Sequence, residues 1–284
     1  MMQSPFNHCS TYLKLLAAVA LTSLVLGCSP QQQEEQETVN ATATPNVLII
    51  AVDDLNDWVG YTGTHPDTIT PNIDALAARG TVFTQAYSQF PLCGPSRASL
   101  FAGMLPSSLG LLKQPRPDSV VAEAAAKHDS LLLHSYFREH GYKTMAVGKL
   151  LHEHIPEDSV DLSGGRGDWD RMVDNERINF DSDNTMTDWA VYPYPEAEMS
   201  DPTAAVWAVE RLQETHDQPF LLMVGFLRPH VPWYVPEQYF DAVGDADALT
   251  LPPYRADDLD DVPSYAQRMN VRDGYPRTNW AIDT

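Results

Sequence analysis

The chain has 284 residues, which is enough for one large domain or two small ones. Apolar residues make up 43% and charged residues 20%, close to globular averages, so disordered, collagen-like and coiled-coil proteins are excluded. The 18 Lys and Arg residues stand against 39 Asp and Glu, a formal net charge of −21, whereas a nucleic-acid groove needs a basic face. We therefore expect no nucleic-acid partner, and three cysteines are too few for a disulfide scaffold.

The first 27 residues have the features of a signal peptide. Lys14 precedes the apolar run 15–27, which is too short to span a bilayer comfortably and has the length of a signal-peptide core. The run ends in Val-Leu-Gly-Cys (25–28), which resembles a bacterial lipoprotein box whose cysteine becomes lipidated. The alternative is an ordinary cleaved signal with a chance cysteine. We predict export to the periplasm or cell surface, with Cys28 anchoring the protein to the outer membrane of a Gram-negative bacterium through lipid alone. The polar residues 28–45 are expected to form a flexible tether.

The rest of the chain, residues 46–284, is predicted to be an α/β domain with a mainly parallel sheet sandwiched by helices. The apolar run 46–52 is typical of a strand buried on both faces. Proline and glycine signals and hydrophobic periodicity then predict, in chain order, helix 71–79, strand 81–87, helix 95–104, helix 130–140 capped by Ser130, strand 142–147, mostly loop over 155–200, helix 201–216 capped by Asp201, and strand 220–226. Beyond Pro229 the sequence shows little periodicity.

Polar side chains follow three of the predicted strands. They are Asp53 and Asp54, then Lys149 and His152, then Arg228 and His230. In parallel sheets ligands bind beyond the carboxyl ends of the strands, so we expect these three clusters to converge at one edge.

The two adjacent aspartates suit a hard divalent cation, although an isolated pair of this kind is more often a solvated turn. The run His152-Glu153-His154 lacks the i, i+4 spacing of a zinc motif, so we predict no zinc there. The histidines at 128, 134 and 140 fall at intervals of six, which separates their faces on a helix, and we expect them at the surface.

The segment 91–97 (Pro-Leu-Cys-Gly-Pro-Ser-Arg) carries the strongest chemical signal. Export would remove Cys9 with the signal and give Cys28 to lipid, so Cys93 is the remaining thiol of the mature chain. It directly precedes a proline-initiated helix, where backbone N–H groups and the helix dipole favour an anion. Arg97, one turn further on, can hold a tetrahedral oxyanion. By themselves these residues indicate a cysteine nucleophile acting on phosphate or sulfate.

The same residues match the C-x-P-S-R signature of type I sulfatases, and the chain resembles this family from about residue 45 to residue 255. Residues 46–54 resemble the opening strand with its metal-binding Asp pair, and residues 141–152 resemble the second signature of the family. The two-residue gap between Lys149 and His152, together with Arg228-Pro229-His230, is most similar to the iduronate-2-sulfatase branch. The resemblance implies an alkaline-phosphatase/sulfatase-like fold.

The resemblance also implies the chemistry. Cys93 would be oxidised by a maturation enzyme to Cα-formylglycine, whose hydrated aldehyde attacks sulfur while Ca²⁺ is held by Asp53, Asp54 and residue 93. Arg97 and Lys149 would clamp the sulfuryl oxygens. His152 would hydrogen-bond the formylglycine hydroxyl, and His230 would contact the sulfate and protonate the leaving oxygen. Arg228 is expected, with Lys149 and His230, on the substrate side.

Two departures from the family pattern concern maturation and metal binding. Ala102-Gly103 replaces the usual Thr-Gly, and residues 231–284 hold no later Asp-His or Asp-Asn pair to complete a calcium shell. We therefore expect an incomplete domain, truncated at its C-terminus, that binds calcium weakly and turns over slowly. The predicted function is hydrolysis of sulfate esters on a sulfated glycan or polysaccharide. The alternatives are a phosphatase or phosphodiesterase of the same superfamily, and a non-catalytic glycan-binding lipoprotein.

Overall fold

Four parallel strands form the central sheet, in the order β1-β5-β2-β3. They are β1 (Val47–Val52), β5 (Phe220–Phe226), β2 (Lys143–Gly148) and the short β3 (Leu162–Ser163). The first three agree with the predicted strands to within one residue. Val47 pairs with Leu221 and Lys143 with Phe220, so the carboxyl ends of β1, β5 and β2 lie at the same edge of the sheet.

The computed structural model describes residues 44–168, 177–179, 187–251, 255, 257 and 260–265, and the elements among them all belong to the unit Pro45–Thr284. The predicted signal peptide, Cys28 and nearly all of the tether lie outside the described residues. No helix in the described part of the chain is long and apolar enough to cross a membrane.

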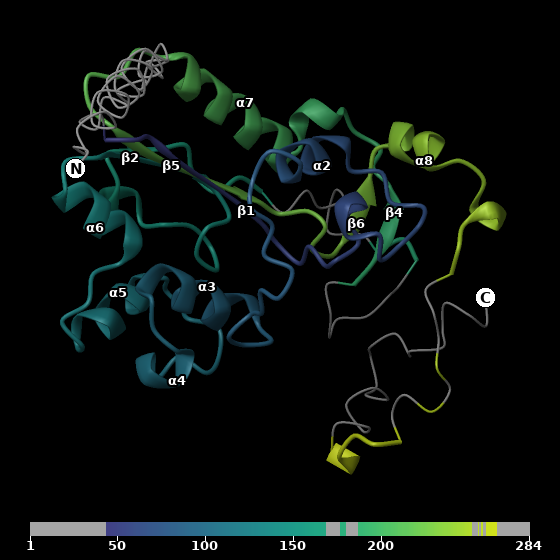
Figure 1. The fold of residues 1–284 in the computed structure, drawn as a ribbon, viewed down its shortest axis with the longest axis horizontal. Coiled ribbons are helices and arrows are strands. Elements are labelled where there is room, and N and C mark those ends of the chain that lie inside the picture. Colours follow the sequence, from purple (N-terminus) through teal and green to yellow (C-terminus); the bar gives the residue numbers. More distant parts are fainter. Residues whose placement is uncertain are drawn as a thin grey trace, which may run out of the picture. The chain divides into compact units, whose positions relative to one another are not determined.

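Helices cover both faces of the sheet (Figure 1). One face carries α3 (Cys93–Ala102), α4 (Pro106–Leu109), α5 (Ser119–Ala126) and α6 (Leu133–Glu139), and the other carries α7 (Ser200–Gln213). On the α7 side, Ala204 and Ala208 pack against the buried side chains of β2 and β5, such as Met145 and Leu222. Removing these apolar surfaces from water is the main force that holds the helices on the sheet.

A second, two-stranded parallel sheet joins β4 (Trp189–Val191) to β6 (Trp233–Val235). The fully buried carboxylate of Asp188 accepts hydrogen bonds from the Tyr234 hydroxyl at 2.6 Å and from the backbone N–H groups of Ile178 and Asn179. The remaining elements are α2 (Pro71–Ala77), α8 (Glu237–Val243) and 3-10 turns at Gly60–Thr62, Glu157–Ser159, Glu196–Glu198 and Ala246–Ala248. The segment 155–200, expected to be mostly loop, contains the short strands β3 and β4, and β6 lies in the segment beyond Pro229. Strands of two or three residues are too short for hydrophobic periodicity to reveal.

One predicted strand is absent, and another is present but less buried than expected. Residues 81–87 form no strand and are all exposed, with Phe83 79% exposed. A segment with strand propensity forms a strand only if another strand pairs with it. Among the described strands, β1 pairs with β5 and not with residues 81–87. β1 itself was expected to be buried on both faces, but Leu48 and Ile50 are 45% and 52% exposed. It lies at the edge of the sheet, and only one of its faces packs against the described core.

Three helix predictions also differ from the structure. Helix α3 begins at Cys93, two residues earlier than expected. Ser130 does not cap α6, which begins at Leu133, because its hydroxyl donates to Ala102 O at 3.4 Å. Asp201 lies inside α7 and is not a cap. Its carboxylate accepts from the backbone N–H groups of Leu227 and Arg228, at 2.6 and 2.8 Å, and so ties α7 to the segment after β5.

Candidate active site

The backbone hydrogen bonds of the sheet continue past the strand ends and place two charged residues side by side. Asp53 N donates to Phe226 O at 3.0 Å, and Lys149 N donates to Gly225 O at 2.9 Å. A Cβ atom on Gly225 would lie 2.0 Å from Lys149 O, so only glycine allows this close approach. The carboxyl ends of β1 and β2 are thus both fastened to β5, with Asp53 and Lys149 at the shared edge.

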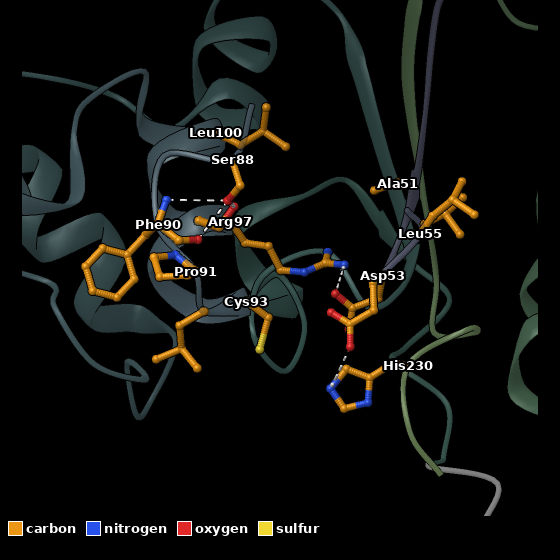
Figure 2. A pocket seen from close by; sticks show the side chains of 14 residues that line it. Ala51, Asp53, Leu55, Ser88, Phe90, Pro91, Cys93, Arg97, Leu100 and His230 are labelled. Carbon is orange, nitrogen blue, oxygen red and sulfur yellow. Dashed lines mark hydrogen bonds and ion pairs between the residues drawn. The ribbon is translucent and has the colours of Figure 1, made fainter. Parts of the chain in front are cut away.

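Asp53 is buried between two cations. Its Oδ1 accepts from Arg97 Nη2 at 2.8 Å, as Figure 2 shows, and its Oδ2 pairs with the ammonium group of Lys149. Burial alone would raise the pKa of Asp53, but the positive charges of Arg97 and Lys149 outweigh it and hold that pKa below its usual value. The three side chains are at most 9% exposed, so each depends on the others for neutralisation.

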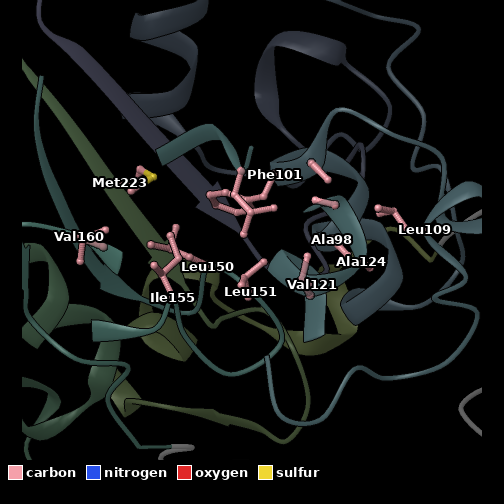
Figure 3. Packing of buried hydrophobic residues seen from close by; sticks show 14 of the residues in the cluster. Ala98, Phe101, Leu109, Val121, Ala124, Leu150, Leu151, Ile155, Val160 and Met223 are labelled. Atoms are coloured by element: carbon pink, nitrogen blue, oxygen red, sulfur yellow. The ribbon is translucent and has the colours of Figure 1, made fainter. Parts of the chain in front are cut away.

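Arg97 also binds the backbone of the segment after β2. Its Nη1 donates to Lys149 O at 2.7 Å and to Leu150 O at 2.9 Å. Leu150 and Leu151, the next two residues, pack into the core with Phe101 of α3 (Figure 3). The sequence predicts Arg97 as an oxyanion clamp, and in the structure its hydrogen bonds also join α3 to the ends of β1 and β2.

Asp54 adopts a left-handed backbone conformation, with a φ of 56°. Aspartate tolerates this region better than most side chains, at a modest cost. The turn brings Asp54 to the same cavity as Asp53, with its Oδ2 3.8 Å from His230 Nε2. Neighbouring side chains of a strand point to opposite faces of the sheet. The turn at Asp54 ends this alternation, so both carboxylates reach the same cavity.

The cavity at this edge has a volume of about 590 Å³. Its polar lining comes from the end of β1, the segment before α3, the N-terminal part of α3 and the segment after β5. These residues are Asp53, Asp54, Ser88, Cys93, Ser96, Arg97 and His230 (Figure 2). Arg228 is not among the lining residues, because its guanidinium donates to His230 O at 2.8 Å. In the described structure Arg228 thus supports His230, whereas the sequence suggests contact with substrate.

Cys93 is the only free cysteine among the described residues, and its side chain is surrounded by hydrogen-bonding groups. Burial opposes ionisation, but hydrogen bonds with His152, His230 and Gln114 and the charge of Lys149 lower the pKa of the thiol to about 5. The Gln114 Nε2 donates to Sγ at 2.9 Å. This environment stabilises negative charge on the atom that residue 93 presents to the cavity.

The two histidines are held in different ways. His230 Nδ1 donates to Val231 O at 2.6 Å, which leaves Nε2 to face Cys93 and Asp54. Burial would lower the pKa of His230, but the hydrogen bond with Cys93 and the Asp54 charge raise it above its usual value. His152 is buried, and its Nδ1 has no hydrogen-bond partner among the described residues.

A buried carboxylate supports the turn that carries His152. Asp118 Oδ2 accepts from the backbone N–H groups of Glu153 and His154, at 2.7 and 3.0 Å. His154 turns away from the cavity, and its ring nitrogens lie 2.7 Å from Gly148 O and 3.0 Å from the Ser163 hydroxyl. Sequence reasoning did not find Asp118 or Gln114, because each acts through contacts distant in the chain and neither lies in a local motif.

The candidate metal ligands at this cavity are of the kind that a hard cation prefers, but there are fewer of them than such an ion takes. Asp53 and Asp54 offer carboxylate oxygens, which Ca²⁺ prefers, but Ca²⁺ takes about six to eight oxygen ligands of all kinds. A thiol is a poor calcium ligand. Within the described residues no group of three or more His, Cys, Asp or Glu side chains forms a metal cluster. An oxygen on residue 93, in place of sulfur, would make this donor set more suitable for calcium.

Comparison with known proteins agrees with the motifs. A family model described as Sulfatase matches residues 45–274. A sulfatase of Formosa agariphila is 36% identical over 273 residues, covering 92% of this chain and 53% of the relative. Human iduronate 2-sulfatase is 30% identical over 234 residues, covering 77% of this chain and 41% of the relative. The chain therefore spans about half the length of these curated relatives.

One solved structure supports the fold assignment. The phosphonate monoester hydrolase of Agrobacterium radiobacter aligns over 73% of this chain and 45% of its own, with a TM-score of 0.51 and 17% identity. At that identity the likeness concerns the α/β architecture alone. Since the sulfatase model covers most of the sequence, and the C-x-P-S-R segment lies where three strand ends meet, this chain belongs to the sulfatase family.

Proposed function

We propose that the protein hydrolyses sulfate esters, with residue 93 as the reacting group. The observation that carries this proposal is the setting of the Cys93 side chain, which two histidines and an amide contact beside the Asp53–Lys149–Arg97 cluster. A sulfuryl group in the adjoining cavity would meet positive charge where its transition state concentrates negative charge. The sulfatase relatives support the reaction class.

Residue 93 would act after conversion to Cα-formylglycine, whose hydrated aldehyde supplies the hydroxyl that attacks sulfur. Two histidines of the chain would then hold and transfer the protons of the reaction. His152 would hold the proton of a hydroxyl at residue 93, a role that its hydrogen bond with Cys93 supports. His230 would donate a proton to the leaving alcohol oxygen, a role that its raised pKa supports. Water and the sulfate ester thus give an alcohol and hydrogen sulfate, with no oxidation or reduction.

Calcium, where present, would be held by Asp53, Asp54 and the oxygen of residue 93, and would supply electrostatic stabilisation of the sulfuryl oxygens. Arg97 and Lys149 each bind one oxygen of Asp53, and their positive charges keep the buried carboxylate ionised for such a role. Because the described residues offer two carboxylates, we expect the 284-residue chain to bind calcium weakly and to turn over slowly.

We further propose a sulfated glycan or polysaccharide as substrate, by analogy with human iduronate 2-sulfatase and with the Formosa agariphila relative named as an ulvan-active sulfatase. The proposal includes export and lipid attachment at Cys28, which would place the protein where extracellular polysaccharides arrive. Mass spectrometry of the mature N-terminus is expected to find Cys28 as the first residue, carrying lipid, and Cys28→Ala should lose both the lipid and this processing. A mature N-terminus without lipid on Cys28 would contradict the lipid anchor.

Peptide mass spectrometry across residue 93 tests the proposed function most directly. Protein from a host that carries a maturation enzyme should show the mass of formylglycine in the 91–97 peptide, and Cys93→Ala should abolish hydrolysis of an aryl sulfate. Parallel assays on sulfate and phosphate monoesters measure the preference, which we expect to favour sulfate. An unmodified thiol in the native host, or a preference for the phosphate ester, would contradict the proposal.

A further inference from the structure

Gln114 makes two hydrogen bonds at the start of α3, and together they fix the orientation of its amide. Its Oε1 accepts from Gly94 N at 2.9 Å, and its Nε2 donates to Cys93 Sγ at 2.9 Å. Because a backbone N–H can only donate, the atom facing Gly94 must be the amide oxygen. The NH₂ group therefore faces residue 93, where it can donate a proton in a hydrogen bond but cannot accept one.

The backbone of α3 leaves room for this amide only because residue 94 is glycine. A Cβ atom at Gly94 would lie 2.0 Å from Gln114 Oε1 and 2.5 Å from Pro115 Cδ. Any larger residue would displace the end of the Gln114 side chain or push away the segment that carries it. Gly94 and Gln114 thus form a matched pair, 20 residues apart in the chain.

We propose that Gln114 is a positioning residue of this site, a fixed hydrogen-bond donor to the reacting atom of residue 93. The amide selects the side-chain orientation in which that atom points between His152 and His230. It also stabilises negative charge on the atom, as a preorganised donor does when an oxygen loses its proton. The part of this inference that concerns catalysis depends on the proposed function, whereas the contact with the thiol does not.

Two substitutions separate the donor role from a merely structural one. Gln114→Glu keeps the length of the side chain and an oxygen that can accept from Gly94 N, but it replaces the donor by a carboxylate. Gln114→Ala removes both contacts. Gln89→Ala is the matched control, because the Gln89 amide lies in the neighbouring exposed segment and donates to Tyr87 O.

The experiment uses the 284-residue chain produced without a maturation enzyme, so that Cys93 stays a thiol, with EDTA present. The rate of alkylation by iodoacetamide is followed from pH 4 to pH 9. Relative to the wild type, Gln114→Ala should raise the midpoint by about 0.5–1 pH unit, because the hydrogen bond from Nε2 to Sγ is lost. Gln114→Glu should raise the midpoint further, because a negative charge would face the thiolate.

Thermal melting of each variant distinguishes folding from donor chemistry. If Gln114 only braces Gly94, Gln114→Ala lowers the melting temperature while its alkylation midpoint coincides with that of Gln89→Ala. That result would overturn the inference. If Gln114→Ala fails to fold, Gln114→Met replaces it, because it keeps the length of the side chain without a donor, whereas the charge of Gln114→Glu would raise the midpoint in either case.

A double-mutant cycle tests the pairing with Gly94. Gly94→Ala should shift the alkylation midpoint in the same direction as Gln114→Ala, and the double variant should shift it no further than the larger single effect. Additive shifts would show that the two residues act separately and would contradict the pairing.

In the matured enzyme, Gln114→Glu should lower kcat on an aryl sulfate by about tenfold or more, with a smaller change in KM. An inactive matured wild type would refute the proposed function and leave the thiol result standing. Normal alkylation shifts with an unchanged kcat would refute only the catalytic part.

Discussion

His134 is 1% exposed and packs edge-on against Phe101, with the ring centroids 6.1 Å apart, although the spacing of the histidines predicts a surface position. Burial, followed by the charge of Arg138, lowers the pKa of His134 to about 4. Its Nδ1 has no hydrogen-bond partner in the described part of the chain. This histidine is a neutral core residue, and it contributes to stability only while it stays neutral.

The pH dependence of folding should reveal His134. Its folded pKa lies below the unfolded value of 6.5, so between about pH 6.5 and pH 4 the unfolded chain binds more protons and stability falls as the pH falls. The stability lost between neutral pH and about pH 4 through this group is roughly 3 kcal/mol. In His134→Leu, the free energy of unfolding measured in urea should decline less over this window than in the wild type. The exposed His128→Leu serves as control, and equal pH profiles for the two variants would contradict the assignment.

The junction of β2, β5 and β1 is the feature that builds the site at the scale of elements. Lys149 follows β2 directly, and a Cβ on Gly148 would lie 2.0 Å from Gly225 O, just as one on Gly225 would lie 2.0 Å from Lys149 O. The two strands therefore approach through a pair of glycines. Asp201 adds a second link, because its carboxylate holds the segment that runs from β5 to His230.

Gly225→Ala should disrupt this junction. The new methyl group meets backbone atoms, which cannot move aside as a flexible side chain does, so we expect a loss of about 1–3 kcal/mol or more in the free energy of unfolding. The displaced Lys149 should also lose its contact with Asp53, and activity of the matured enzyme should fall further than stability alone explains. Urea unfolding measures the first effect. Gly80→Ala, whose Cβ would meet only Leu76 O at 3.3 Å, is the control and should change stability little.

At the scale of the whole molecule, the net charge of −21 opposes an anionic substrate. Attraction must come from the site itself, where Arg97, Lys149 and His230 gather beside the cavity, against an unfavourable long-range field. The long-range part is screened by salt, with a Debye length of about 8 Å at physiological ionic strength, whereas the buried pairs are screened much less.

This charge distribution predicts a distinctive salt response, given the proposed function. For a sulfated polysaccharide, kcat/KM should rise as NaCl increases from 10 mM to 150 mM, because repulsion between two polyanions is screened. For a small aryl sulfate the change should be smaller. Initial rates for both substrates at each salt concentration provide the measurement. A fall of kcat/KM for the polysaccharide would instead indicate a basic docking surface for the polymer.

The sequence by itself determined the strands β1, β2 and β5, the order of the motifs and the residues that follow each strand, because these depend on local hydrophobic patterns and on short fixed spacings. From strand order alone, Asp53, Lys149 and His230 could be expected at one edge of a parallel sheet. The roles of these residues and of Cys28 stay predictions until they are tested.

Only the tertiary structure decided which side chains surround Cys93 and which faces are buried. Gln114 reaches Cys93 from 21 residues away, and Asp118 supports the turn of His152 from more than 30 residues away. The exposed face of β1, the unpaired segment 81–87 and the buried His134 likewise depend on which distant elements pack against them. Local propensity cannot encode such contacts, since their free energy arises when remote parts of the chain exclude water from one another.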